Sequence, residues 1–227
     1  MDISSSENTL VIGSEGVIGN ALCNQLEKTY EVHRISRKNC DYSEPSLKEH
    51  AQKMSQFGKF KIIICTIGVL HDDIVKPEKR LNDINPEQLS HYFFVNTILP
   101  MMVIKHFSPL LDSKTESCFV CLSAMVGSTS DNQLGGWYGY RASKAALNSL
   151  IKTSSIELSR NNKQSCVVAI HPGTTIGDLS APYATRINPR KYYTPEKTAK
   201  RVIEIIENLE ASKSGQFLNW NGKVLPW

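Results

Sequence analysis

The regular alternation of short apolar runs with longer segments of helical period constrains the fold of this chain most strongly. Four runs, TLVIG, KFKIIICTIG, SCFVCLS and SCVVAIHPG, are rich in apolar and β-branched residues, as expected for strands buried on both faces of a parallel sheet. Helical patterns separate the strands, at residues 17–28, 45–56, 86–111, 138–160 and 195–209. The order predicts an α/β fold: a single Rossmann-type, doubly wound parallel sheet with helices on both faces.

Length and composition predict one domain over residues 1–227 with a small-molecule partner. The formal charge of +4 is spread along the chain, and no basic block with interleaved aromatics indicates nucleic-acid binding. The N-terminus lacks a signal-peptide pattern, and no apolar run approaches the roughly 20 residues of a membrane span. We therefore expect no membrane association and a cytoplasmic location.

The six cysteines fall mostly in apolar runs, as buried small side chains do in a reducing compartment. Cys118 and Cys121 form a C-x-x-C pattern inside SCFVCLS. Residues three apart on a strand point to opposite faces, so we expect neither a metal nor a redox site there.

A glycine-rich turn, Gly13-Ser-Glu-Gly16-Val-Ile-Gly19, joins the first predicted strand to the first helix. Glycines allow the backbone to approach a phosphate closely, and the helix N-terminus offers free N–H groups. The turn therefore predicts a dinucleotide site, the alternative being an ordinary strand-to-helix connection.

The end of the second predicted strand is basic, with Arg34, Arg37 and Lys38 around Ser36. NAD-binding domains normally carry an acid at this point, whereas a guanidinium pairs with a 2′-phosphate. The sequence therefore favours NADP(H), with a solvated basic turn as the alternative. Asp41 could accept a hydrogen bond from the adenine amine.

Tyr140 and Lys144 stand four residues apart on a predicted helix, so their side chains share one face. A neighbouring ammonium stabilises a phenolate and lowers the pKa of the phenol from about 10, as acid–base catalysis at neutral pH requires. By spacing alone, an exposed Tyr and Lys would be the default interpretation.

These motifs, together with Asn96, Ser123 at a strand end and Pro172-Gly173 after the next strand, resemble the short-chain dehydrogenase/reductase family across nearly the whole chain. The strings DNQLGGWYGYRASKAALN, AIHPGTTIGDLS and NGKVLPW are similar to C-factor-like and Sniffer-like carbonyl reductases. The resemblance implies NADPH-dependent reduction of an aldehyde, ketone or quinone.

The resemblance also implies roles for individual residues. Tyr140 would donate a proton to the carbonyl oxygen, Lys144 would lower its pKa and hold the nicotinamide ribose, and Asn96 would join a proton relay. The implied cofactor-binding residues are Gly13, Ser14, Glu15, Val17, Ile18, Gly19, Ser36, Arg37, Asp41, Thr66, Ile67, Gly68, Tyr140, Lys144, Pro172, Gly173, Thr174 and Thr175.

A physical argument supports the role of Asn96. Pro100 has no N–H, so the main-chain carbonyl of Asn96 loses its helical partner, and a water leading towards Lys144 could replace it. The alternative is that Asn96 simply belongs to a helix bent by proline.

The sequence departs from the family pattern at three places. Ala124 stands where a carbonyl-polarising serine is usual, so Ser123 or Ser128 would have to substitute. The usual Asn-Asn-Ala-Gly appears as Cys-Thr-Ile-Gly at residues 65–68, which puts the packing of the cofactor pocket in doubt. Val17 replaces a glycine, with Gly16 one residue early.

Two functions fit the sequence: a carbonyl reductase, or a nucleotide-binding signalling protein of C-factor type with little turnover, which Ala124 favours. Residues 177–195 form a long basic and tyrosine-containing insertion that we expect to cover the substrate. The family resemblance further suggests a homodimer through the long helices at residues 86–111 and 138–160.

Overall fold

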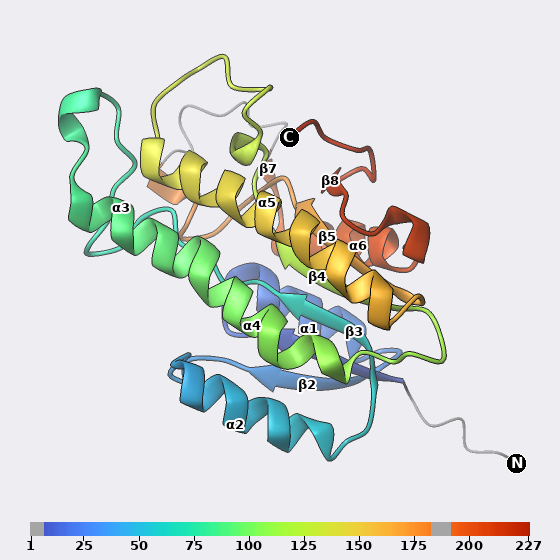
Figure 1. Ribbon diagram of the computed structural model, residues 1–227. Coiled ribbons are helices and arrows are strands. Elements are labelled where there is room, and N and C mark those ends of the chain that lie inside the picture. Colours follow the sequence, from blue (N-terminus) through green and yellow to red (C-terminus); the bar gives the residue numbers. More distant parts are fainter. Residues whose placement is uncertain (1–6, 183–191) are drawn as a thin grey trace, which may run out of the picture.

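The computed structural model describes residues 7–182 and 192–227. Six parallel strands form one sheet in the order β2-β1-β3-β4-β5-β8, which confirms the predicted Rossmann-type fold (Figure 1). The strands are β1 Asn8–Ile12, β2 Glu31–Ile35, β3 Phe60–Cys65, β4 Ser117–Leu122, β5 Ser165–His171 and β8 Phe217–Asn219. A small parallel pair, β6 Thr174–Thr175 and β7 Tyr192–Tyr193, was not predicted.

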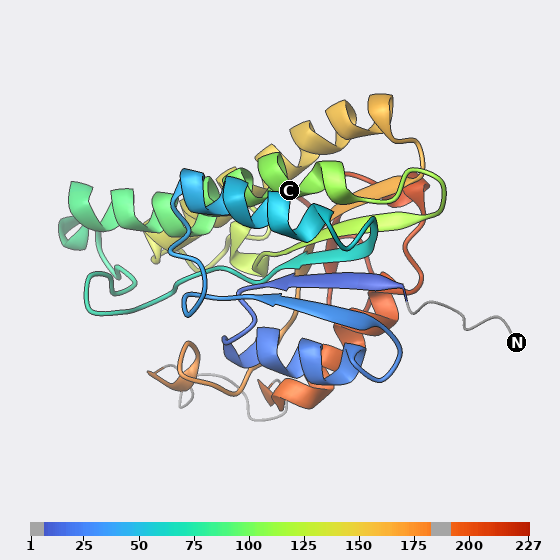
Figure 2. The ribbon, with the colours of Figure 1, turned by 90° about the horizontal axis from the view of Figure 1, so that it is seen from below.

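Helices cover both faces of the sheet (Figure 2). Their bounds are α1 Val17–Leu26, α2 Glu44–Ser55, α3 Pro86–Phe93, α4 Leu99–Phe107, α5 Tyr138–Asn161 and α6 Pro195–Ile206. Short 3₁₀ turns lie at Leu81–Asp83, Ser108–Leu110, Met125–Gly127 and Ala211–Lys213. α1 and α6 pack on one face, while α2, α4 and α5 pack on the other.

The two-residue period of each strand divides the core into two layers. On β4, Cys121 faces α2, α4 and α5, whereas Cys118 faces α1 and α6. The two thiols of the C-x-x-C pattern therefore lie on opposite sides of the sheet, as the sequence predicts. All six cysteines are buried and free.

The expected long helix at residues 86–111 is interrupted. A π-helical turn, Phe94–Ile98, separates α3 from α4, and the N–H of Leu99 donates to the carbonyl of Phe94 five residues back. Pro100 follows directly and has no N–H to donate. The widened turn is the physical consequence of that proline, and such turns recur at functional sites.

The stretch Pro86–Leu110 is long and apolar enough, at mean hydropathy 1.2, to pass as a membrane span by composition, so the expectation that no segment approaches one was wrong. Within the fold, however, it is a core helix. Asn96 and Thr97 are buried, and both hydrogen-bond to Ser143 of α5. Packing against the sheet and α5 buries the apolar side chains of α4, whereas Phe94 and Ile98 of the π turn stay exposed.

Candidate active site at the carboxyl edge of the sheet

The predicted site residues follow the carboxyl ends of adjacent strands. The chain leaves β1 towards β2 on one side and continues through β3, β4 and β5 on the other, so the strand order reverses between β1 and β3. Open α/β sheets bind ligands at such a reversal. The glycine-rich turn follows β1, and Thr66, Ile67 and Gly68 follow β3.

The glycine-rich turn is shaped by close backbone contacts. Gly13 has φ +91°, and its N–H and that of Ser14 donate to the carbonyl of Ile35 at 2.9 and 3.1 Å. A Cβ on Gly19 would lie 2.3 Å from the carbonyl oxygen of Gly13, so only glycine fits there. The departure at Val17 leaves this geometry intact.

The N-terminus of α1 fits a phosphate group. Gly16 occupies the N-cap position, no side chain caps the helix, and its first turn contains no acid. The positive end of the helix therefore carries N–H groups that side chains leave unpartnered. Val17 is exposed and Ile18 half-buried, whereas the Ser14 hydroxyl is committed to the carbonyl of Ile35 at 3.1 Å.

At the end of β2, only part of the basic cluster is free to meet a nucleotide. The Arg34 guanidinium is bound by Glu27 at 2.7 Å, and Lys38 pairs with Glu15 at 2.6 Å between two exposed side chains. Arg37 is exposed and makes no hydrogen bond or ion pair with any residue that the structure describes. Arg37 is therefore the cation of the trio that a 2′-phosphate could engage.

Ser36 and Asp41 flank the same position. Ser36 is buried, and its hydroxyl accepts from the N–H of Lys38 at 3.2 Å. The exposed Asp41 carboxylate accepts from the N–H of Ser43 at 2.8 Å, and the hydrogen bonds from Ser43 hold the pKa of Asp41 below its usual value. Asp41 is thus ionised and oriented, as an acceptor for an amine should be.

Thr66 joins the end of β3 to the end of β1, a connection that was in doubt because the amide side chains usual in the family are missing. Its hydroxyl lies 3.1 Å from the carbonyl of Ile12 and 2.9 Å from that of Gly13, which joins the end of β3 to the glycine-rich turn. A threonine thus links these two loops in place of the amides.

Asn96 fixes the next part of the same loop. Its side-chain oxygen accepts from the N–H of Val69 at 2.8 Å, and its nitrogen donates to the carbonyl of Val69 at 2.9 Å and to the Ser143 hydroxyl at 3.1 Å. The side chain is fully buried. Asn96 therefore joins the loop after β3 to α5, a role beyond the main-chain one that the sequence suggested.

Tyr140 and Lys144 lie on the buried face of α5, as their spacing predicts. The Lys144 ammonium donates to the carbonyl of Leu122 at 3.1 Å. A Cβ placed on Gly68 would lie 3.1 Å from that ammonium and 3.3 Å from the side-chain oxygen of Asn96. Gly68, in the loop after β3, is therefore the point where two implied relay residues meet, Asn96 of the π turn and Lys144 of α5.

The electrostatics of this pair differ from the expectation. Burial raises the pKa of Tyr140 above its ordinary value, and burial lowers the pKa of Lys144 to about 8. The expected lowering of the phenol pKa by the ammonium is therefore wrong for this structure, because burial outweighs the effect of the nearby cation. The phenol is held protonated, which is the form a proton donor needs.

The two candidate serines differ in whether their proton is available. β4 has ended at Leu122, and the Ser123 hydroxyl donates to the side-chain oxygen of Asn148 at 2.6 Å. The Ser128 hydroxyl accepts from the N–H of Asp131 at 3.1 Å and donates to no residue that the structure describes. Ala124 itself packs in the apolar cluster that contains Tyr140.

After β5, Gly173 has φ +82°, and a Cβ there would touch the rings of Trp220 and Tyr193 at 3.3 and 3.4 Å. Pro172 precedes it, Thr174 pairs with β7, and Thr175 bonds through its hydroxyl to that of Thr198 at 2.8 Å. The threonine hydroxyl at 175 is thus committed to α6.

The start of the expected lid lies over the nucleotide turn. A Cβ on Gly177 would meet the Val17 side chain at 3.0 Å, and the His71 ring lies 2.9 Å from the carbonyl oxygen of Asp178. The middle of the predicted lid, residues 183–191, lies outside the described residues. Its described beginning therefore bridges α1 and the loop after β3.

Sequence reasoning missed two buried polar residues here, Glu78 and Asn148, and the half-buried His171. Glu78 binds the N-terminus of α5, Asn148 holds Ser123, and His171 ends β5 with its Nδ1 enclosed and without a hydrogen-bond partner in the part of the chain that the structure describes. Burial lowers the pKa of His171 to about 4. An isolated acid in a loop or a polar residue in a helix gives no sequence signal, since its partner is distant along the chain.

The family model described as Enoyl-(Acyl carrier protein) reductase matches residues 16–210. A 1-hydroxy-2-glutathionyl-2-methyl-3-butene dehydrogenase of Rhodococcus sp. is 30% identical over 82% of this chain and 76% of its own. The C-signal protein of Myxococcus xanthus is 28% identical over 65% of this chain and 83% of its own.

Solved structures share the fold. An NADPH-bound carbonyl reductase from chicken fatty liver has a TM-score of 0.81 at 20% identity, over 98% of this chain and 99% of the other. The carbonyl reductase Sniffer of D. melanogaster has a TM-score of 0.81 at 18% identity, over 98% and 100%. Together with the family model, these likenesses bear out the resemblance in the sequence: the chain belongs to the short-chain dehydrogenase/reductase family of oxidoreductases.

Proposed function

We propose that this protein is an NADPH-dependent reductase that converts the carbonyl of an aldehyde, ketone or quinone to an alcohol. The observation that carries the proposal is the buried phenol of Tyr140 on the same face of α5 as Lys144, which borders Gly68 together with Asn96. This group lies at the edge of the sheet that also presents the uncapped N-terminus of α1.

Each residue then has a definite task. NADPH, when bound, would supply the hydride, and Tyr140 would donate the proton to the carbonyl oxygen. Lys144, freed from the carbonyl of Leu122, would bind the ribose hydroxyls, and its charge would stabilise the phenolate left after proton transfer. Asn96 holds the loop after β3 at the reaction site.

We assign the polarising hydroxyl to Ser128 rather than Ser123. A serine hydroxyl can donate one hydrogen bond. Ser123 already donates its hydrogen bond to Asn148, whereas the Ser128 hydroxyl donates to none of the described residues. Gly127 places this segment against α5, since a Cβ there would lie 2.9 Å from Lys144. Ser128 can therefore donate to a carbonyl without breaking an existing bond.

NADP(H) is proposed as the cofactor because an arginine, Arg37, stands where NAD-binding domains carry an acid, and it is exposed and pairs with no residue of the described ranges 7–182 and 192–227. An exposed guanidinium can form a forked pair with a 2′-phosphate, which NAD lacks. The carbonyl reductase from chicken fatty liver is bound to NADPH. The relative from Rhodococcus is named as a dehydrogenase, which is consistent with the same class of reaction.

The test is to follow NADPH absorbance with a panel of aldehydes, ketones and quinones, for the wild type and for Tyr140→Phe. The wild type should oxidise NADPH with at least one class, and the variant should bind NADPH equally but lose most turnover. If both proteins bind NADPH and neither oxidises it with any substrate, the reductase proposal fails.

A second candidate is a nucleotide-responsive signalling protein with little turnover. The alanine at position 124, beside Tyr140, favours it because the usual hydroxyl is missing, and the C-signal protein is among the relatives. NADPH binding without turnover in the same panel would select this alternative.

We further propose a homodimer through the long helices. Phe94 and Ile98, one turn apart, and Ile156 of α5 are exposed apolar side chains on these elements, with 50%, 46% and 48% of their surface accessible. Sedimentation of the wild type beside Phe94→Glu should show a dimer that the substitution dissociates. A monomeric wild type would refute this proposal.

A further inference from the structure

The helix that carries Tyr140 begins without a cap of its own. The residue before it, Trp137, has φ +55° and makes no side-chain capping bond, and the first turn contains no acid. The first N–H groups of a helix have no partner within the helix. The start of α5 therefore depends on groups from elsewhere in the chain.

Glu78, some sixty residues earlier, supplies those groups. Both oxygens of its carboxylate lie 3.2 Å from the N–H of Gly139, and its main-chain carbonyl accepts from the N–H of Trp137 at 2.6 Å. Glu78 is buried, with 2% of its surface exposed, and it forms no ion pair with another described side chain. The negative carboxylate instead meets the positive end of the α5 dipole.

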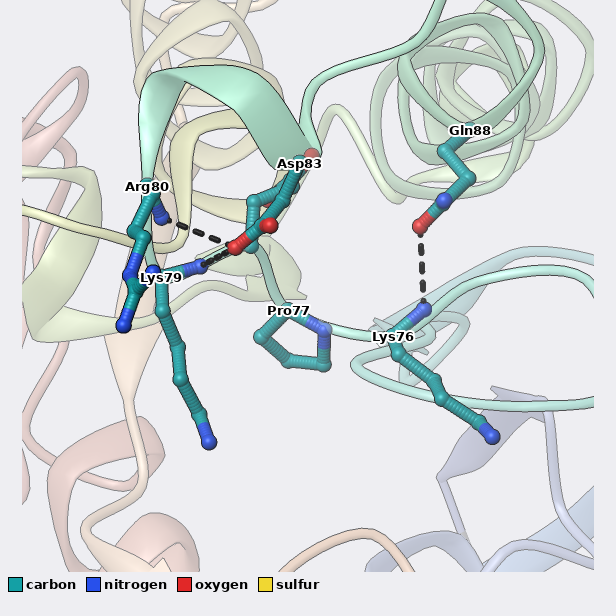
Figure 3. A pocket seen from close by; sticks show the side chains of 7 residues that line it. Lys76, Pro77, Lys79, Arg80, Asp83 and Gln88 are labelled. Atoms are coloured by element: carbon teal, nitrogen blue, oxygen red, sulfur yellow. Dashed lines mark hydrogen bonds between the residues drawn. The ribbon is translucent and has the colours of Figure 1, made fainter.

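Hydrogen bonds from Asp83 and Gln88 hold the segment that carries Glu78 (Figure 3). The Asp83 carboxylate accepts from the N–H groups of Lys79 and Arg80 at 3.1 and 3.0 Å, and the Gln88 side chain accepts from the N–H of Lys76 at 3.2 Å. These bonds frame a cavity of about 430 Å³. Hydrogen bonds on both sides of Glu78 therefore hold the segment from which its carboxylate contacts α5.

Gly139 is clasped between Glu78 and the ring of Tyr92. A Cβ on Gly139 would lie 2.4 Å from Cδ2 of Tyr92 and 2.9 Å from the nearer carboxylate oxygen of Glu78. Tyr92 is anchored by its hydroxyl, which donates to the carbonyl of Leu70 at 2.6 Å. Its ring centroid lies 6.2 Å from that of Tyr140. Glu78 and Tyr92 thus enclose Gly139, the residue immediately before Tyr140.

We propose that Glu78 is a positioning residue for catalysis. Its carboxylate caps the N-terminus of α5, which has no capping side chain of its own, and thereby holds the Tyr140 phenol in place for proton transfer. The inference rests on the proposed reductase function, in which Tyr140 is the proton donor. Proton transfer is sensitive to geometry, and a misplacement of about 1 Å can cost on the order of 10²-fold in rate.

The experiment compares Glu78→Ala, Glu78→Gln and the matched control Asp112→Asn, which also changes a carboxylate that accepts from a main-chain N–H, that of Lys114, but ahead of β4 at the amino edge of the sheet. Hydrogen exchange of residues 136–144 reports on the start of the helix, and kcat and KM are measured with the best carbonyl substrate. NADPH affinity is measured by titration. Each Glu78 variant is also combined with Tyr140→Phe.

The proposal predicts faster exchange at the start of α5 in Glu78→Ala, a kcat reduced by on the order of 10²-fold, and unchanged NADPH affinity. Glu78→Gln keeps one acceptor oxygen for Gly139 and should recover most of the loss. In the Tyr140→Phe background, Glu78→Ala should cost little further, because the two changes act through the same group.

Three results would overturn the proposal: exchange at residues 136–144 that Glu78→Ala leaves unchanged, an equal kcat loss in Asp112→Asn, or full additivity of Glu78→Ala with Tyr140→Phe. Failure of the reductase function would look different. In that case the wild type would turn over no carbonyl, while the exchange measurement would still decide whether Glu78 clamps α5.

Discussion

Replacing Ala124 with serine tests directly how this site polarises a carbonyl. Ala124 has 8% of its surface exposed and packs in one cluster with Tyr140, Val69 and Leu70. Its backbone, at φ −142° and ψ 144°, accepts any residue. Serine would thus add a hydroxyl beside the proton donor without a change of backbone conformation.

The expected gain follows from the value of one hydrogen-bond donor to the developing oxyanion, on the order of 10²-fold to 10³-fold in rate. Because we assign part of that role to Ser128, Ala124→Ser should raise kcat/KM by about tenfold in the wild type. In a Ser128→Ala background, which should itself lose activity, the same change should restore about 10²-fold.

The assay is steady-state NADPH oxidation for the wild type, both single variants and the double variant. Ala124→Cys is the control, since it adds similar bulk with a weak donor. Burying a hydroxyl costs about 1–3 kcal/mol if it stays unpaired, so urea denaturation must confirm that each variant is folded. The reasoning is refuted if all four proteins bind NADPH equally and have equal kcat/KM.

Three further predictions follow from single side chains. Arg37→Ala should weaken the binding of NADPH far more than that of NADH, by about 1.5–3 kcal/mol for the loss of a charge-assisted hydrogen bond. Equal losses of affinity in titrations with both nucleotides would refute the 2′-phosphate assignment. The Lys144 ammonium, with its pKa lowered to about 8, is lost as pH rises through that value, so kcat/KM for NADPH should fall above pH 8 in the wild type, and a flat profile would contradict this. His171 has its pKa lowered to about 4, so between pH 6.5 and 4 the unfolded chain binds a proton that the native state does not. The free energy of unfolding should therefore fall by about 2.5 kcal/mol more in the wild type than in His171→Asn over this range, and equal slopes in the two denaturation series would contradict this.

Much of the fold was predictable because it is encoded in local pattern. Runs such as IIIC and FVCL are apolar at every position, as expected for a strand covered on both faces. The pairing of Tyr140 with Lys144 was equally readable, since four-residue spacing fixes a shared helix face. The glycine-rich turn followed from its place between a strand and a helix.

The rest of the site depends on contacts between distant segments. The bond from Glu78 to Gly139 and that from Ser123 to Asn148 join residues whose separation no spacing rule predicts. The phenol pKa of Tyr140 was also misjudged, because sequence spacing shows the nearby cation but not the burial that outweighs it. Pro100 indicated a missing helical bond but not that the helix would widen into a π turn.

The most direct test of the central claim is to trace the hydride. NADPH deuterated at the transferable position of the nicotinamide is incubated with an aldehyde and the wild-type protein, and the alcohol is analysed by mass spectrometry. The account predicts one deuterium on the former carbonyl carbon, with formation of that product greatly slowed in Tyr140→Phe. Tight NADPH binding with no deuterated alcohol, or the same rate of formation in both proteins, would contradict it.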